Sequence, residues 1–310
     1  MKPLIELIMP YSTVSIIGLS KNAGKTTALN YIIEKYSRLN TTLGLTGIGR
    51  DGEDTDIVTH TKKPRIFVDK GTIVATAEGL LPLCDITFSV VSVTEYTTSL
   101  GRIVIVKAES AGYVQLGGPS ISGQLKKLTK EMRVLGAEKI IIDGSINRKS
   151  QAAQSIDEDG SAAILCTGAA LSPNMDIVTA QTVHALSLLT LPKFDDNSAS
   201  EDERIYCCGM VSDKKIRDLI MSGIGMQGKY IIADDPSKIF ISEDTYAKLL
   251  IKGGILTVQK PMNIAAITVN PTSPQGFAFC PKEFIEKIRC KVNVPVYDVK
   301  LEEAAHDGIE

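Results

Sequence analysis

The chain has 310 residues, of which 44% are hydrophobic and 23% are charged, so it is long enough to bury one large core or two modest ones. A formal net charge of −2 provides no excess of Lys and Arg for holding a nucleic-acid backbone, and nucleic acid is not expected as a ligand. No segment approaches the roughly 18 uninterrupted apolar residues of a membrane span, and no cleavable leader is recognised, so we expect a cytoplasmic protein with no membrane partner. The six cysteines show no C-x-x-C spacing, which favours reduced thiols.

The most informative segment lies near the N-terminus, where an apolar strand expected at residues 14–18 leads through a Gly-Lys-Thr-Thr turn into a helix expected at residues 25–38. In such a turn, backbone amides and the N-terminus of the helix surround phosphate groups. We therefore predict a phosphate-binding loop. The residues expected to bind the nucleotide are Asn22, Ala23, Gly24, Lys25, Thr26 and Thr27.

Each residue of the turn has an expected task. Lys25 should reach the β- and γ-phosphates and take part in catalysis, and the Thr26 hydroxyl should complete the coordination of Mg²⁺. Thr27 should donate to the α-phosphate. A Gly-Lys-Thr turn can also simply cap a helix, but the strand before it and the helix after it favour phosphate binding. The guanine-reading sequence Asn-Lys-x-Asp is absent, which favours ATP over GTP.

The loop is one residue longer than the common G-x-x-x-x-G-K-[ST] pattern, because Leu19 stands where that pattern has glycine and the nearest earlier glycine is Gly18. This spacing resembles the loop of dethiobiotin synthetase and its relatives, in the branch of P-loop proteins that also holds the MinD and nitrogenase-iron-protein ATPases. The resemblance implies an α/β fold of the P-loop NTPase type, with a mostly parallel sheet flanked by helices. Lys21 lies four positions before Lys25, one short of the signature lysine of the MinD type, and no role is carried over to it.

A second strand is expected at residues 42–48, and an acidic loop follows it at residues 51–56. Related ATPases place a switch segment here, whose carboxylates orient the attacking water or bind the metal. Asp51 is the first candidate for both tasks because it follows the strand most closely, and Glu53 is the second. A solvated loop without a function explains the same composition, so this alternative stays open.

Further strands are expected before residue 116, and a helix at residues 122–135 follows the turn at residues 117–120. That turn can hold a substrate anion or can serve as a plain connection, and the plain connection is favoured. The next strand, at residues 138–144, ends in Asp143 and resembles a Walker B element. We expect Asp143 to hold a Mg²⁺-bound water and to act in catalysis, although Asp-Gly is also an ordinary strand exit.

The alternation of strands and helices continues to the C-terminus, interrupted by one acidic polar stretch. We predict a P-loop nucleotide-binding domain at residues 1–192, an acidic linker at residues 193–203 and an additional C-terminal α/β domain at residues 204–310. The loop at residues 270–276 can form a wall for a base, but a Pro- and Gly-rich strand exit explains it equally well.

Several of these segments together resemble a bacterial family associated with the reactivation of adenosylcobalamin-dependent lysine aminomutase. The matching segments are residues 18–27, 49–53, 112–120, 142–144 and 162–171. The resemblance implies an ATPase that helps to exchange damaged cobalamin for intact cofactor on a protein partner. Relatives in the wider branch often place their sites at a dimer interface, which leaves a homodimer open.

Two classes of function follow. In the first, Mg-ATP orders the acidic loop and hydrolysis releases it, so the protein is a switch on a partner and turns over slowly alone. In the second, it is a small-molecule kinase or ligase resembling dethiobiotin synthetase. The switch is favoured because the sequence shows no second group of residues for a small substrate. A P-loop fold that binds nucleotide without hydrolysing it is the third alternative.

Overall fold

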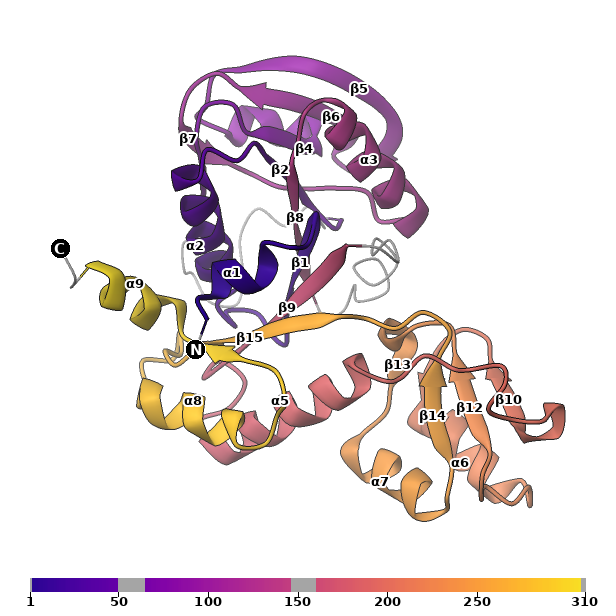
Figure 1. Cartoon of the computed structure of the whole chain (residues 1–310). Coiled ribbons are helices and arrows are strands. Elements are labelled where there is room, and N and C mark those ends of the chain that lie inside the picture. Colours follow the sequence, from indigo (N-terminus) through magenta and orange to yellow (C-terminus); the bar gives the residue numbers. More distant parts are fainter. Residues whose placement is uncertain (1, 50–64, 146–159, 308–310) are drawn as a thin grey trace. The chain divides into compact units, whose positions relative to one another are not determined.

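The computed structural model describes residues 2–49, 65–145 and 160–307. The chain divides into two compact units, which are treated separately below. Unit 1 consists of Met1–Val183 and Ile264–Glu310, and unit 2 of His184–Asn263. Figure 1 shows the elements of both. Among the described residues, no helix is long and apolar enough to cross a membrane.

Unit 1 is built on a nine-stranded sheet. In spatial order its strands are β16 (Val296–Tyr297), β15 (Ile264–Asn270), β9 (Ser161–Gly168), β1 (Thr13–Gly18), β8 (Lys139–Ser145), β2 (Leu43–Gly47), β4 (Ile73–Ala77), β6 (Gly101–Ala108) and β5 (Phe88–Thr98). Every neighbouring pair from β16 to β4 is parallel, whereas β6 is antiparallel to both β4 and β5. The prediction of an α/β fold with a large, mostly parallel sheet is confirmed.

Helices cover this sheet, as predicted. They are α1 (Leu4–Ile8), α2 (Lys25–Arg38), α3 (Ser122–Val134), the first part of α5 (Met175–Leu189), α8 (Pro281–Arg289) and α9 (Val299–Asp307), with a 3-10 turn η1 (Glu78–Leu83). A separate antiparallel pair is formed by β3 (Ile66–Val68) and β7 (Gly112–Val114). The core on the α2 side also includes residues of α1 and of this pair. α3 packs against β8 and β4.

Helix α2 shows why the sequence pattern was informative. It begins at Lys25 and ends at Arg38, as predicted. Its apolar residues recur at the spacing of one helical face and are all buried: Ala28, Leu29, Ile32, Ile33 and Tyr36. Burial of each large aliphatic side chain contributes about 1.5–3 kcal/mol, so this face fixes α2 firmly on the sheet behind the loop.

Unit 2 has its own sheet and its own core. Its elements are a parallel sheet of β10 (Arg204–Cys207), β12 (Tyr230–Ala233) and β14 (Ile255–Val258), a short pair of β11 (Val211–Ser212) and β13 (Ile239–Phe240), helices α6 (Asp213–Met221) and α7 (Glu243–Ile251), and 3-10 turns η3 (Glu201–Glu203) and η4 (Pro236–Lys238). Ile216, Ile231, Leu249 and Val258 are fully buried at its centre.

The observed division differs from the predicted C-terminal domain at residues 204–310. Residues 264–310 belong to unit 1, because β15 pairs with β9 in the main sheet. The predicted linker is also more structured than its composition suggested. Phe194 is buried, its amide donates to the Val258 carbonyl, and its ring packs edge-on against Tyr230 at 5.5 Å. Ser200 and Glu203 form a capping box at η3.

Candidate functional site

The segment between β1 and α2 has the backbone of an anion-binding loop. Asn22 and Gly24 both adopt left-handed conformations, with φ of 60° and 91°, and Gly24 is the N-cap of α2. Alternation of this kind turns successive amides toward one side and forms a concavity that suits anions. The first turn of α2 adds the partial positive charge of a helix N-terminus.

The side chain of Lys25 folds back across this loop. A Cβ atom at Gly18 would lie 2.8 Å from Lys25 Cγ and Cδ and 3.2 Å from its Nζ, so no larger residue fits there without moving the lysine. The Lys25 ammonium group therefore lies close to Gly18 at the end of β1.

Asp143 lies beside the loop at the carboxyl end of β8. In the sheet it is flanked by Ile16 of β1 and Gly47 of β2. Its Oδ1 atom is buried and has no hydrogen-bond partner among the described residues. Burial raises the pKa of Asp143, and the nearby Lys25 ammonium opposes this rise. The structure therefore brings Lys25 and Asp143 together, as the rule for carboxyl ends of parallel strands predicts.

The residues present fit a magnesium ion that arrives with a nucleotide. Buried polar atoms are normally paired, so the orphaned Oδ1 of Asp143 suits a partner such as a metal-bound water. Thr26, in the first turn of α2, would supply a hydroxyl ligand. The described part of the chain contains no cluster of three or more His, Cys, Asp or Glu side chains able to hold a metal alone. Most oxygen ligands would thus come from phosphates and water, as Mg²⁺ prefers.

Asn270 is a site residue whose contacts the sequence did not predict. It ends β15, and its Nδ2 donates to the Asn22 carbonyl at 3.0 Å. A Cβ atom at Gly24 would lie 2.9 Å from Asn270 Cβ, so the two segments are in close contact. The only available signal was an Asn-Pro pair after an apolar strand, which ordinary turns also show.

A small cavity of about 10 Å³, room for about one water molecule, lies next to this contact. Gly24, Thr27, Asn270 and Asp298 are among the residues that line it. Asp298 is buried and its Oδ1 accepts from the Lys300 amide at 3.0 Å at the start of α9. Burial raises the pKa of Asp298, and hydrogen bonds from the backbone amides of Lys300 and Leu301 counteract the rise. The cavity borders the same loop as Lys25.

Cys166 lies beneath the loop. Its carbonyl accepts from the Leu19 amide at 2.9 Å, and the Thr268 hydroxyl lies 3.1 Å from its sulfur. Burial raises the pKa of its thiol to about 11, so it stays neutral and acts as a core residue. All six cysteines are free, as expected.

The turn at residues 117–120 is explained by packing. A Cβ atom at Gly118 would lie 1.9 Å from the Gly47 carbonyl oxygen, and the Gly117 amide donates to Thr76 Oγ1 at 3.1 Å. Helix α3 follows Ile121 without a side-chain cap.

The predicted acidic loop, with Asp51 and Glu53, lies outside the described residues.

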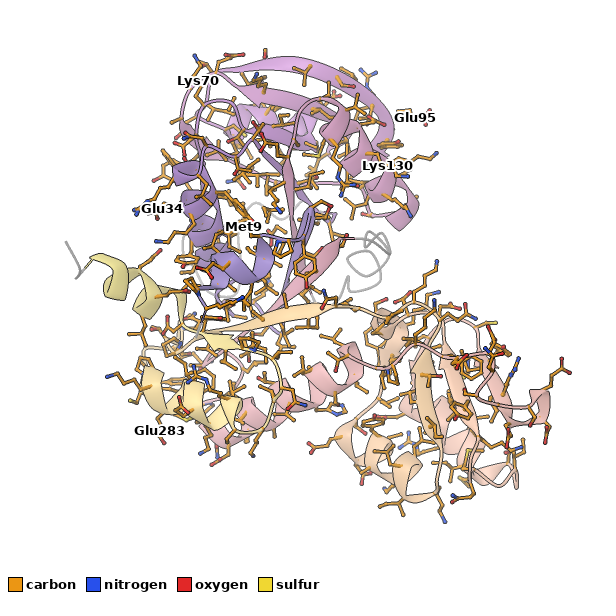
Figure 2. The ribbon with its side chains drawn as sticks, in the orientation of Figure 1. Met9, Glu34, Lys70, Glu95, Lys130 and Glu283 are labelled. Atoms are coloured by element: carbon orange, nitrogen blue, oxygen red, sulfur yellow. The ribbon has the colours of Figure 1, made fainter. Side chains whose placement is uncertain are left out.

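A larger hollow, of about 810 Å³, lies away from the loop on the outer face of α2, where Glu34 is labelled in Figure 2. Two pairs of its polar side chains contact each other: Arg38 pairs with Glu34, and Ser37 donates to Asp69. The site at Lys25 and Asp143 is the better candidate for chemistry because it contains a buried carboxylate oxygen without a hydrogen-bond partner among the described residues.

When the chain is compared with known protein families, with curated proteins and with solved structures, none of the three comparisons finds a match.

Proposed function

We propose that the protein is a Mg²⁺-dependent P-loop ATPase that acts as a switch or reactivation factor on a partner enzyme. One observation carries the proposal: Lys25, at the start of α2, lies close to Asp143, whose Oδ1 is buried and has no hydrogen-bond partner among the described residues. A cation and a carboxylate near the carboxyl end of a parallel sheet suit a nucleoside triphosphate with its Mg²⁺.

Each residue has a task in this proposal. The loop amides and Lys25 bind the phosphates, and Lys25 neutralises charge on the transferred phosphoryl group. Thr26 would hold the metal and Asp143 would hold one of its waters. The metal supplies further charge neutralisation when bound. Asp51 remains the candidate for orienting the attacking water.

One point supports a switch over a small-molecule kinase or ligase. Unit 2 has its own core and can carry a surface for a protein partner. The family resemblance of the motifs suggests an adenosylcobalamin-dependent aminomutase as that partner, with exchange of damaged cobalamin as the outcome.

Phosphate release from Mg-ATP tests the proposal. We expect slow turnover by the protein alone, its loss with EDTA or in Lys25→Ala, and acceleration by the partner enzyme. Turnover that instead requires a small carboxylate substrate would support the ligase. Absence of Mg²⁺-dependent hydrolysis under all these conditions would refute an ATPase.

A further inference from the structure

Helix α2, which begins at the loop between β1 and α2, is in contact with two other helices of unit 1. Both α1 and α9 pack against it (Figure 1). Leu4 of α1, Tyr31 of α2 and Val299 of α9 belong to one buried core. Because such a core is closely packed, a movement of α9 would affect the other two helices.

Two hydrogen bonds join α1 to the segment around the start of α9. Glu302 Oε1 accepts from the Leu4 amide at 2.8 Å, and the Tyr297 hydroxyl donates to the Lys2 carbonyl at 2.6 Å. Leu4 is the first residue of α1, so its amide is one of those that no carbonyl within the helix can pair. The position of α1 thus depends on where α9 lies.

Two buried polar atoms at the contact between α2 and α9 are unpaired. The Tyr31 hydroxyl and Glu302 Oε2 are both buried, and neither makes a hydrogen bond of normal geometry with a described residue. The two groups are near each other, because burial and then the charge of the Glu302 carboxylate raise the pKa of Tyr31. Buried polar atoms are normally paired, and a small movement of α9 toward α2 would let this hydroxyl donate to this carboxylate.

The contact between α2 and α9 is also loosely packed at the end next to the loop. The cavity of about 10 Å³ described above is lined by Gly24 and Thr27 of the loop and α2, and by Asp298 and Lys300 at the start of α9. This is room for about one water molecule. One displacement of α9 toward α2 would both close this space and pair Tyr31 with Glu302.

A triphosphate on the loop would favour that displacement. Lys300 is exposed and lines the cavity beside Gly24 and Thr27. Phosphate groups at the loop would bring several negative charges near the Lys300 ammonium, and this attraction grows as the separation shrinks. The start of α9 would therefore be drawn toward the loop.

We propose that α9 moves toward α2 when Mg-ATP binds, so that Tyr31 donates to Glu302 and α1 is held more firmly. The proposal rests on the proposed function, because it requires a nucleotide at the loop. The nucleotide shifts the equilibrium because it makes better contacts with the closed position of α9 than with the open one. The surface that α1 and α9 form then differs between the nucleotide-free and the nucleotide-bound protein, as a switch on a partner requires.

Hydrogen exchange with and without Mg-ATP tests this movement, while titration calorimetry measures nucleotide binding separately. In the wild type we expect Mg-ATP to slow exchange in α1 and α9 roughly 2- to 10-fold, as one added hydrogen bond would. Tyr31→Phe keeps the buried ring and removes only the hydroxyl, so it should fold, bind Mg-ATP and lose most of the slowing. Lys300→Gln removes the attraction to phosphate and should reduce the slowing as well.

Tyr36→Phe is the matched control. Tyr36 lies on the same helix and is as buried as Tyr31, and its hydroxyl is likewise unpaired among the described residues. Burial raises the pKa of Tyr36 to about 12, with no contribution from a carboxylate. Its Phe variant should therefore respond to Mg-ATP as the wild type does.

The outcomes separate this proposal from the proposed function. Binding of Mg-ATP without slower exchange in α1 and α9 would overturn the movement of α9 and leave the nucleotide site standing. Absence of Mg-ATP binding would overturn both. A full wild-type response in Tyr31→Phe, or an equal loss in Tyr31→Phe and Tyr36→Phe, would show that the bond to Glu302 is not formed and would also overturn the proposal.

Discussion

The side-chain amide of Asn270 donates a hydrogen bond to the backbone carbonyl of Asn22 across 3.0 Å. The bond joins the end of β15 to the loop after β1, although β9 lies between these two strands in the sheet. A segment from late in the chain is therefore bonded to the loop in which Asn22 and Gly24 are left-handed. Because this loop must be ordered before it can bind an anion, the contact should contribute to affinity.

Asn270→Ala should weaken binding of Mg-ATP without unfolding the protein. One net hydrogen bond is worth about 0.5–1.5 kcal/mol, so we expect Kd to rise roughly 2- to 10-fold. Titration calorimetry measures the change. Gln275→Ala alters an exposed side chain of the same loop and should leave Kd unchanged. Equal affinities in all three proteins would show that the tether is not needed.

Gly24→Ala should impair both stability and nucleotide binding. Gly24 has φ of 91°, where an L-residue costs about 1–2 kcal/mol, and the added Cβ would meet Asn270 Cβ at 2.9 Å. Thermal unfolding and a binding titration measure the two effects. Gly123→Ala is the control, because its Cβ would meet nothing within 4 Å at the start of α3. A Gly24→Ala variant that behaves like this control would contradict the loop geometry.

Gly18→Ala should weaken nucleotide binding and leave the stability of the fold nearly unchanged. The three heavy atoms nearest to its new Cβ all belong to the flexible Lys25 side chain, which can move away. We expect near-normal unfolding and weaker Mg-ATP binding, because the lysine that we propose to bind the phosphates is displaced. Unchanged affinity would mean that the folded-back position of Lys25 plays no part in binding.

Asp143→Asn should lower turnover and yet stabilise the nucleotide-free protein. Burial raises the pKa of Asp143 in the folded state above its value in the unfolded chain, so its ionisation opposes folding once the pH exceeds the unfolded value. The amide cannot ionise, so a gain in the free energy of unfolding is expected near neutral pH. Unfolding curves at several pH values measure it. The gain in the free energy of unfolding should vanish below the pKa that Asp143 has in the unfolded chain.

Ile216→Ala should destabilise unit 2 while leaving the nucleotide site intact. Ile216 is fully buried in the core of unit 2, and loss of such a side chain costs about 2–5 kcal/mol. Hydrogen exchange should therefore accelerate in β10, β12 and β14 and not in β1 or β8. Faster exchange in all five strands would mean that the two cores unfold together.

Local sequence patterns sufficed to place helix α2. Both of its ends, Lys25 and Arg38, were predicted, because apolar periodicity and glycine are local signals. Helices α1 and α9 were not predicted. The approach of Asp143 to Lys25 also followed from a general rule of parallel sheets. Their catalytic and metal roles stay predictions.

The division of the chain into two units was harder to predict from the sequence. β15 is an apolar run like its neighbours in the chain, and nothing in its composition says which sheet it joins. Pairing with β9 is a contact between distant segments, as is the bond from Asn270 to Asn22. Such contacts depend on the packing of the whole unit and not on local propensity.

The most direct measurement of nucleotide binding is thermal stability with ATP, ADP, GTP or no nucleotide, each with and without Mg²⁺, in the wild type and in Lys25→Ala. A free ligand at about 100 times its Kd adds roughly 2.7 kcal/mol, and each kcal/mol shifts the midpoint of a unit of this size by about 2–4 °C. We predict a Mg²⁺-dependent rise of several degrees with ATP in the wild type and none in Lys25→Ala. No shift with any nucleotide, or an equal shift in the variant, would contradict a phosphate-binding role for this loop.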